Sequence, residues 1–259
     1  MRFWPLVAIL LWSCATTGGR TPTTYTESAQ ALYEQGLDRL ESHNYEQAIV
    51  IFEQVRARFP YSSYAALAEL SIADTEFARG RYLESIAVYE AFTRFHPTHP
   101  RLDYAYFRIA EAHRRTIPSS FFIFPPTAER DQTAVRATRT AVETFLRRFE
   151  GSEYVGRAQE IHREVLEILA KHELAVARFY EKREKWDGAA GRFRYLLSHY
   201  PGVGFDTEAT LGLANAEWRA GRPEQARAIL ESFLREESGE DAAEARKLLD
   251  EIEGSPTQP

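Results

Sequence analysis

The chain contains a single cysteine, Cys14, and its thiol is the only one in the sequence. Met1 and Arg2 precede an apolar run from Phe3 to Trp12. A positive start, a short apolar segment and a small residue before the cleavage site are typical of an export signal. The run is too short to cross a bilayer, which takes about 20 apolar residues. We therefore expect residues 1–13 to be a signal peptide.

The four residues Leu11-Trp12-Ser13-Cys14 resemble the recognition sequence of the lipoprotein signal peptidase. The resemblance implies cleavage before Cys14, a diacylglyceryl thioether on its sulfur and an acylated amino group. Several acyl chains anchor a protein durably, since each buried methylene contributes about 0.8 kcal/mol. Residues 14–26 are rich in threonine and predict a flexible, lipidated tether. The alternative is an ordinary signal peptide that carries a free thiol.

The composition indicates a soluble, folded protein. Hydrophobic residues make up 44% of the chain and charged residues 27%, which is the balance of a globular domain rather than of a disordered one. A lone cysteine allows no internal disulfide, so packing must hold the fold. The net charge of −6 argues against nucleic acid as a partner.

Histidines and carboxylates are the remaining candidates for chemistry. His96 and His99 lie in the sequence His-Pro-Thr-His-Pro, but a protein metal site needs three or four converging ligands and no third is evident. His172-Glu173 lacks the second histidine of a zinc-protease helix. The sequence has no dinucleotide fingerprint, no P-loop and no nucleophile elbow. We therefore expect no catalytic residue, no metal and no cofactor other than the lipid on Cys14.

Similar segments recur along the chain at intervals longer than one helix. Aromatic residues beside a turn residue mark four of them, at 59–64, 95–97, 149–154 and 200–205. Pro60 and Pro97 are about 37 residues apart, as are Pro201 and Ser238. A period near 34 residues with a closing proline is typical of the tetratricopeptide repeat, a helix-turn-helix unit.

Small and aromatic residues recur in register within these units. They are Gly36, Ala48, Phe52 and Pro60 in the first unit; Ala73, Gly80, Ser85, Tyr89 and Pro97 in the second; Ala177, Ala189, Phe193 and Pro201 in the fourth; and Ala214, Gly221, Ala226, Phe233 and Ser238 in the fifth. Small residues let the two helices approach closely, the aromatic fills the space to the next unit, and proline ends the second helix. The pattern predicts an all-α tetratricopeptide-repeat solenoid of about five helical hairpins, plus a short C-terminal helix near residues 242–253.

The third unit is longer than the others. We expect its helices at about residues 101–115 and 131–149, with an aromatic loop between them. Phe121-Phe122-Ile123-Phe124 should be docked, against the protein's own repeats or against a partner, because an exposed apolar run promotes aggregation. Residues from about 152 to 184 contain no proline and carry an apolar stripe, which predicts one long helix that bridges the two halves.

The first helices of successive repeats line the concave binding surface of such arrays. The register places ten residues on this surface: Tyr33, Leu37, Leu40, Leu70, Asp74, Phe77, Tyr104, Phe107, Glu111 and Arg114. As a set they predict an apolar, aromatic peptide-binding groove with one basic end. The alternative for each of them is a place in the core between repeats.

The export signal, the lipidation cysteine, the threonine-rich tether and the five repeats together resemble the BamD family, the lipoproteins of the outer-membrane β-barrel assembly machine. The resemblance covers residues 14–240. It is most specific in Pro97-Thr98-His99-Pro100-Arg101-Leu102-Asp103-Tyr104-Ala105, and it extends to Phe121-Phe122, to Glu129-Arg130-Asp131 and to residues 169–180. One departure is Phe205-Asp206-Thr207-Glu208, which lacks the arginine that some members use toward the barrel subunit, BamA.

The resemblance implies a non-enzymatic scaffold that is lipid-anchored at the periplasmic face of the outer membrane. Ala15 fits this location, because an aspartate after the lipidated cysteine commonly retains lipoproteins at the inner membrane. Residues 151–253, the fourth and fifth units with the end helix, would bind the POTRA region of BamA, with other assembly lipoproteins as further partners. Residues 27–150, the first three units, would present the groove to unfolded β-barrel clients, with Arg114 pairing with the carboxylate of their aromatic C-terminal signal. The alternative is another periplasmic tetratricopeptide lipoprotein that serves Tol-Pal or cell-wall machinery.

Overall fold

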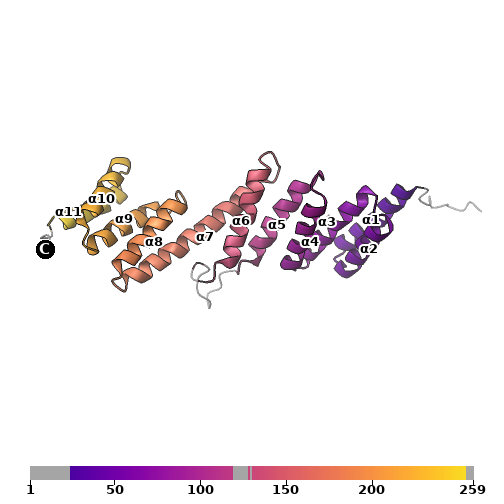
Figure 1. Cartoon of the computed structure of the whole chain (residues 1–259), viewed down its shortest axis with the longest axis horizontal. Helices are drawn as coiled ribbons and strands as arrows, with labels where there is room; N and C mark the ends of the chain where they lie inside the picture. Colours follow the sequence, from indigo (N-terminus) through magenta and orange to yellow (C-terminus); the bar gives the residue numbers. More distant parts are fainter. Residues whose placement is uncertain (1–23, 119–127, 129, 255–259) are drawn as a thin grey trace, which may run out of the picture. The chain divides into compact units, whose positions relative to one another are not determined.

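A computed structural model describes residues 24–118, 128 and 130–254 (Figure 1). These residues form two compact units, which divide between Ala68 and Glu69. Cys14, the signal peptide, almost all of the predicted tether and the predicted docking of Phe121-Phe122-Ile123-Phe124 lie outside the described residues.

The first unit contains α1 (Tyr25–Glu41), α2 (Tyr45–Arg58) and the start of α3 (Ser63–Ala78). Helix α1 begins within the predicted tether, which corrects its end from residue 26 to residue 24. The cause is a capping box, which the composition of the tether did not reveal. The Thr24 hydroxyl accepts from the backbone N–H of Glu27 at 3.1 Å, and the Glu27 carboxylate accepts from the backbone N–H of Thr24 at 3.1 Å.

The second unit begins inside α3 and continues through the remaining helices. They are α4 (Tyr82–Phe95), α5 (Leu102–Thr116), α6 (Thr133–Arg148), α7 (Val155–Glu181), α8 (Trp186–His199), α9 (Asp206–Arg219), α10 (Pro223–Glu236) and α11 (Glu240–Gly254). From α4 onward each helix packs against the next in the chain. The described residues form helices and no strand, so the predicted all-α tetratricopeptide fold is confirmed.

The small and aromatic residues of the repeats lie where close packing needs them. Phe52, Tyr89 and Phe193 are at most 2% exposed, and Ala48, Ala73, Ala189 and Ala226 are fully buried. A Cβ on Gly36 would overlap with the ring of Phe52, and one on Gly212 would overlap with Phe193 of the preceding repeat. The aromatic therefore fills the space left by a glycine, both within a repeat and between repeats.

The helices of the repeats also end and begin close to the prolines and glycines of the predicted pattern. Helices α2, α4 and α8 each end two residues before a proline, at Arg58, Phe95 and His199. Gly80 and Gly221 have φ values of +76° and +82° at the turns that precede α4 and α10, a conformation that glycine adopts without strain.

Helix α7 is the predicted long helix, and it links the third repeat to the fourth. Ala158 and Ile161 pack with α5 and α6, whereas Val165, Leu169 and Leu174 belong to a core shared with α8 and α9. Its 27 residues span about 40 Å, whereas the predicted 33 residues would span about 50 Å, because the helix begins after Tyr154 and ends before Lys182. The predicted boundary between the client-binding half, which ends at residue 150, and the BamA-binding half lies just before this helix. It therefore falls inside the second unit.

The C-terminal repeat is closed by α11, which extends one to two residues beyond the predicted 242–253 at each end. Ala245 and Ile252 of α11 pack with Ala226 and Leu230 of α10. Within the part of the chain that the structure describes, no helix combines the length and the apolar character that crossing a membrane requires.

Candidate functional site

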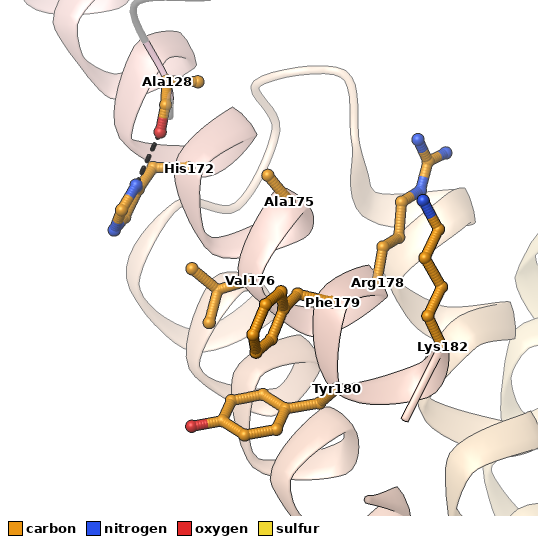
Figure 2. A pocket seen from close by; sticks show the side chains of 8 residues that line it. All are labelled: Ala128, His172, Ala175, Val176, Arg178, Phe179, Tyr180 and Lys182. Carbon is orange, nitrogen blue, oxygen red and sulfur yellow. Dashed lines mark hydrogen bonds between the residues drawn. The ribbon is translucent and has the colours of Figure 1, made fainter. Parts of the chain in front are cut away.

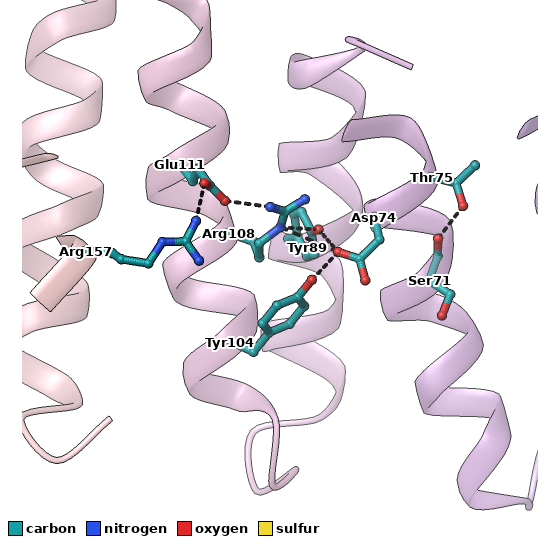
Figure 3. Close-up of polar contacts among 8 residues, drawn as sticks. All are labelled: Ser71, Asp74, Thr75, Tyr89, Tyr104, Arg108, Glu111 and Arg157. Carbon is teal, nitrogen blue, oxygen red and sulfur yellow. Dashed lines mark hydrogen bonds and ion pairs between the residues drawn. The ribbon is translucent and has the colours of Figure 1, made fainter. Parts of the chain in front are cut away.

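A cluster of polar side chains joins the first helices of three repeats in the second unit (Figure 3). Asp74 on α3 accepts hydrogen bonds from the hydroxyls of Tyr104 on α5, at 2.5 Å, and of Tyr89 on α4. Arg108 on α5 donates through Nε to the Tyr89 hydroxyl at 3.0 Å and through Nη1 to Glu111 at 2.6 Å. We call Asp74, Tyr89, Tyr104, Arg108, Glu111 and Arg157 the polar ladder.

The helical period explains how α5 contributes three members of the ladder. Tyr104, Arg108 and Glu111 are spaced four and three residues apart, so they lie on one face of the helix. Arg157 reaches Glu111 from the first turn of α7, with its Nη2 2.7 Å from Glu111 Oε1. One carboxylate therefore ties the guanidinium groups of two repeats together.

Burial fixes the direction of the hydrogen bonds to Asp74. Burial, and then the neighbouring Asp74 carboxylate, raise the pKa of the Tyr89 hydroxyl far above its usual range, and the pKa of Tyr104 is raised by the same two causes. Both hydroxyls therefore keep their protons near neutral pH and donate to Asp74.

Aromatic rings and arginines alternate beside the ladder. The guanidinium carbon of Arg108 lies 3.8 Å from the ring centre of Phe77, and that of Arg101 lies 4.3 Å from the ring centre of Tyr104. The side chain of Arg108 is only 16% exposed, whereas that of Arg157 is 58% exposed. This arrangement offers aromatic edges and guanidinium donors to a ligand, which suits the binding of a polypeptide.

The predicted groove residues differ in how far they are buried. Leu70 and Phe107 are each 1% exposed, and this corrects the predicted groove lining at two positions. Phe107 belongs to the core because its ring stacks on Tyr154 of the following repeat, with the ring centres 4.9 Å apart, and also contacts Phe145. Phe77 and Tyr104 are partly exposed beside the ladder.

Three of the predicted groove residues lie in the first unit, on α1. Tyr33, Leu37 and Leu40 are half-buried on α1. The ring of Tyr33 packs between those of Phe52 and Tyr64, with both centre-to-centre distances 5.6 Å. Their role in peptide binding stays a prediction.

Arg114, the predicted basic end of the groove, is held by a carboxylate of the same chain. Its Nε and Nη2 donate to the two oxygens of Glu164 on α7 at 2.7 and 2.8 Å. Sequence reasoning missed Glu164, because 50 residues separate the two positions. It also missed Arg108 and Arg157, although the i, i+4 spacing from Tyr104 to Arg108 is a signal that could have found the first of them.

A hollow of about 610 Å³ lies along the C-terminal half of α7 (Figure 2). Its lining residues are Ala128, His172, Ala175, Val176, Arg178, Phe179, Tyr180 and Lys182. His172 Nδ1 lies 2.6 Å from the backbone oxygen of Ala128, so this nitrogen carries the proton and donates it. The Phe179 side chain is 50% exposed, and the Arg183 guanidinium carbon lies 3.6 Å from its ring centre. The hollow therefore combines an apolar floor with a cationic rim.

Two buried carboxylates form ion pairs in the last two repeats. Glu217 on α9 is fully buried and accepts from Arg194 on α8 and from Arg222 at the start of α10. Glu173 on α7 is 3% exposed and accepts from Arg192 on α8 at 3.0 Å. These carboxylates are surrounded by packed repeats, which marks them as structural.

The histidines that raised the question of a metal are engaged elsewhere. His96 Nε2 lies 2.9 Å from Glu69 Oε2, and the backbone N–H of Arg101 donates to His99 Nδ1 at 3.1 Å. Among residues 24–118, 128 and 130–254, no group of three or more potential ligands has the geometry to hold a metal ion.

Comparisons with known proteins match the chain to outer membrane assembly factors of several bacteria. The chain is 28% identical over 239 residues to the outer membrane protein assembly factor BamD of Neisseria meningitidis serogroup A, covering 87% of this chain and 88% of that protein. It is 31% identical over 185 residues to BamD of Pasteurella multocida, covering 70% and 69% of the two chains.

Among solved structures, the TPR2AB domain of yeast Sti1 resembles the chain with a TM-score of 0.46 and 12% identity, covering 87% of this chain and 83% of that one. The family of outer membrane lipoproteins named YfiO matches residues 26–229, which is most of the chain. The chain therefore belongs to this family of outer membrane lipoproteins.

Proposed function

We propose that this protein is a non-enzymatic scaffold of the outer-membrane β-barrel assembly machinery, anchored at the periplasmic face by lipid on Cys14. The observation that carries the proposal is its similarity, over 87% of the chain, to a protein named as an outer membrane assembly factor. This similarity favours the assembly machinery over Tol-Pal or cell-wall machinery as the setting in which the scaffold works.

The face of the polar ladder supports a role in client recognition. Unfolded β-barrel proteins end in an aromatic residue with a free carboxylate, and this face presents Phe77 and Tyr104 next to arginines. Aromatic contact would supply affinity, and a guanidinium group would bind the carboxylate through charge-assisted hydrogen bonds. We assign client binding to the second and third repeats on this basis, and a part for the first repeat stays a prediction.

The hollow along α7 supports a role for the C-terminal half in holding the POTRA region of BamA. Phe179 is a large, half-exposed apolar side chain, and Arg178, Lys182 and Arg183 surround it. Exposed aromatic residues flanked by arginine are enriched among the anchors of protein interfaces. In the segment where some relatives carry an arginine toward BamA, Glu208 instead pairs with Arg178, which leaves Lys182 and Arg183 as the cations of this surface.

The client role predicts a large loss of peptide affinity when Phe77 is replaced. Phe77→Ala should weaken the binding of a labelled peptide that ends in an aromatic residue by about ten- to a hundredfold. The physical reason is the loss of about 1.5–3 kcal/mol from one buried aromatic anchor. Fluorescence titration of the purified full-length protein measures the effect.

Phe95→Ala is the matched control, because Phe95 is 72% exposed at the C-terminal end of α4 and lies outside the ladder. Its affinity for the peptide should equal that of the wild type. Equal affinities for all three proteins, with circular dichroism showing intact folds, would place the client site elsewhere.

A further inference from the structure

A small hollow between α5 and α7 is rich in arginine. It has a volume of about 270 Å³ and is lined by Glu111, Arg114, Arg115, Arg157, Glu160 and Ile161. Three guanidinium groups from two repeats thus meet at one place, directly beyond the Glu111 end of the polar ladder. Such a cluster is suited to an anionic ligand, because guanidinium groups bind carboxylates through paired, charge-assisted hydrogen bonds.

The arginines of the hollow differ in how they are paired. Arg114 forms a two-pronged contact with Glu164, and Arg157 shares Glu111 with Arg108. Arg115 is exposed and makes no hydrogen bond or ion pair with any residue that the structure describes. The hollow therefore offers one guanidinium group that an incoming anion can meet first.

The contact between Arg114 and Glu164 is the easiest of these pairs to exchange. Their side chains are 37% and 42% exposed, so water screens the pair, and a ligand that offers the same two-pronged contact can take the place of Glu164. Glu111 is 12% exposed and holds two arginines, so it is far harder to displace. A ligand carboxylate would replace Glu164 and leave the ladder intact.

We propose that this hollow binds the terminal carboxylate of an extended polypeptide and that Glu164 is an internal competitor for Arg114. The inference rests on the proposed client-binding function and names the place where the client's chain end would lie. Arg114 and Tyr104 are ten residues apart on α5, about 15 Å along the helix. About five extended residues cover that distance, so a peptide whose end lies in the hollow would reach the aromatic face.

The competition predicts an unusual gain of affinity on mutation. Glu164→Gln removes the competing charge and should tighten the binding of a hexapeptide with an aromatic, free-acid C-terminus by about two- to fivefold, the range expected for an exposed ion pair. The same peptide with an amidated C-terminus should bind both proteins equally. Comparing the two peptides separates a terminal carboxylate from side-chain carboxylates within the sequence.

Glu160→Gln is the matched control for the general effect of charge, because Glu160 lines the hollow without an ion pair to Arg114. It should change the free-acid affinity less than Glu164→Gln does. An unchanged free-acid affinity in Glu164→Gln, or an equal gain for the amidated peptide, would refute the competition while leaving client binding intact. If the wild type and both variants bind neither peptide, the inference and the proposed client function are both wrong.

Discussion

Replacing both arginines that contact Glu217 is expected to destabilise the last two repeats by about 3–5 kcal/mol, the usual cost of leaving a buried charge without its partner. Glu217 is fully buried, whereas the side chains of Arg194 and Arg222 are 60% and 33% exposed. In Arg194→Ala/Arg222→Ala the buried carboxylate loses both of its counter-charges, so the cost falls on the folded state.

Adding Glu217→Leu to the double variant should restore much of the lost stability, because an apolar side chain of similar size needs no counter-charge. Lys171→Ala is the control, since it removes an exposed pair with Glu167 and should cost at most about 1 kcal/mol. Repeat proteins open locally, so the measurement is amide hydrogen exchange in α8, α9 and α10. Unchanged protection of these helices in the double variant would show that Glu217 does not depend on the two arginines.

Replacing Cys14 is expected to abolish attachment to the outer membrane. Without the thiol no diacylglyceryl group can be added, so the proposed anchor is lost. Cys14→Ser should accumulate as an unprocessed precursor or as a soluble periplasmic protein. The measurement combines membrane fractionation with intact-mass determination of both proteins, and Ser13→Ala, which keeps the thiol, serves as the control.

Two results together would contradict lipidation. They are a Cys14→Ser protein that still fractionates with the outer membrane and a wild-type protein whose mass contains no acyl chains. The free-thiol reading of the sequence predicts the second of these. Lipidation predicts that the wild type and Ser13→Ala carry the same acyl mass and fractionate together.

The helical repeats could be predicted because local residues determine them. Small residues such as Gly36 and Ala48, aromatics such as Phe52 and closing prolines such as Pro60 act within one hairpin, and their spacing is visible in the sequence. The same holds for the existence of α7, which the uninterrupted apolar stripe predicts, although the helix is shorter than the predicted 152–184. The end of the tether was missed because it depends on a single capping interaction between Thr24 and Glu27.

The candidate site was only partly predictable, because its contacts join residues far apart in the chain. Helical register places Asp74, Phe77, Tyr104 and Glu111 on one face, and the structure has them in or beside the polar ladder, whereas Phe107 is one position away and packs into the core. The pairing of Arg114 with Glu164 depends on how closely α7 approaches α5, which no local pattern encodes. The residues of a helix face are therefore predictable from sequence, but their partners on other helices are not.

Purification of the native complex tests most directly whether this protein is a scaffold of the β-barrel assembly machinery. The full-length, lipidated protein would be tagged at its C-terminus, isolated from outer membranes in mild detergent, and its partners identified by mass spectrometry. The account predicts that BamA is recovered in near-stoichiometric amount and that Phe179→Ala/Arg183→Ala, which alters the hollow along α7, reduces its recovery. Recovery of Tol-Pal or cell-wall proteins without BamA would contradict the account.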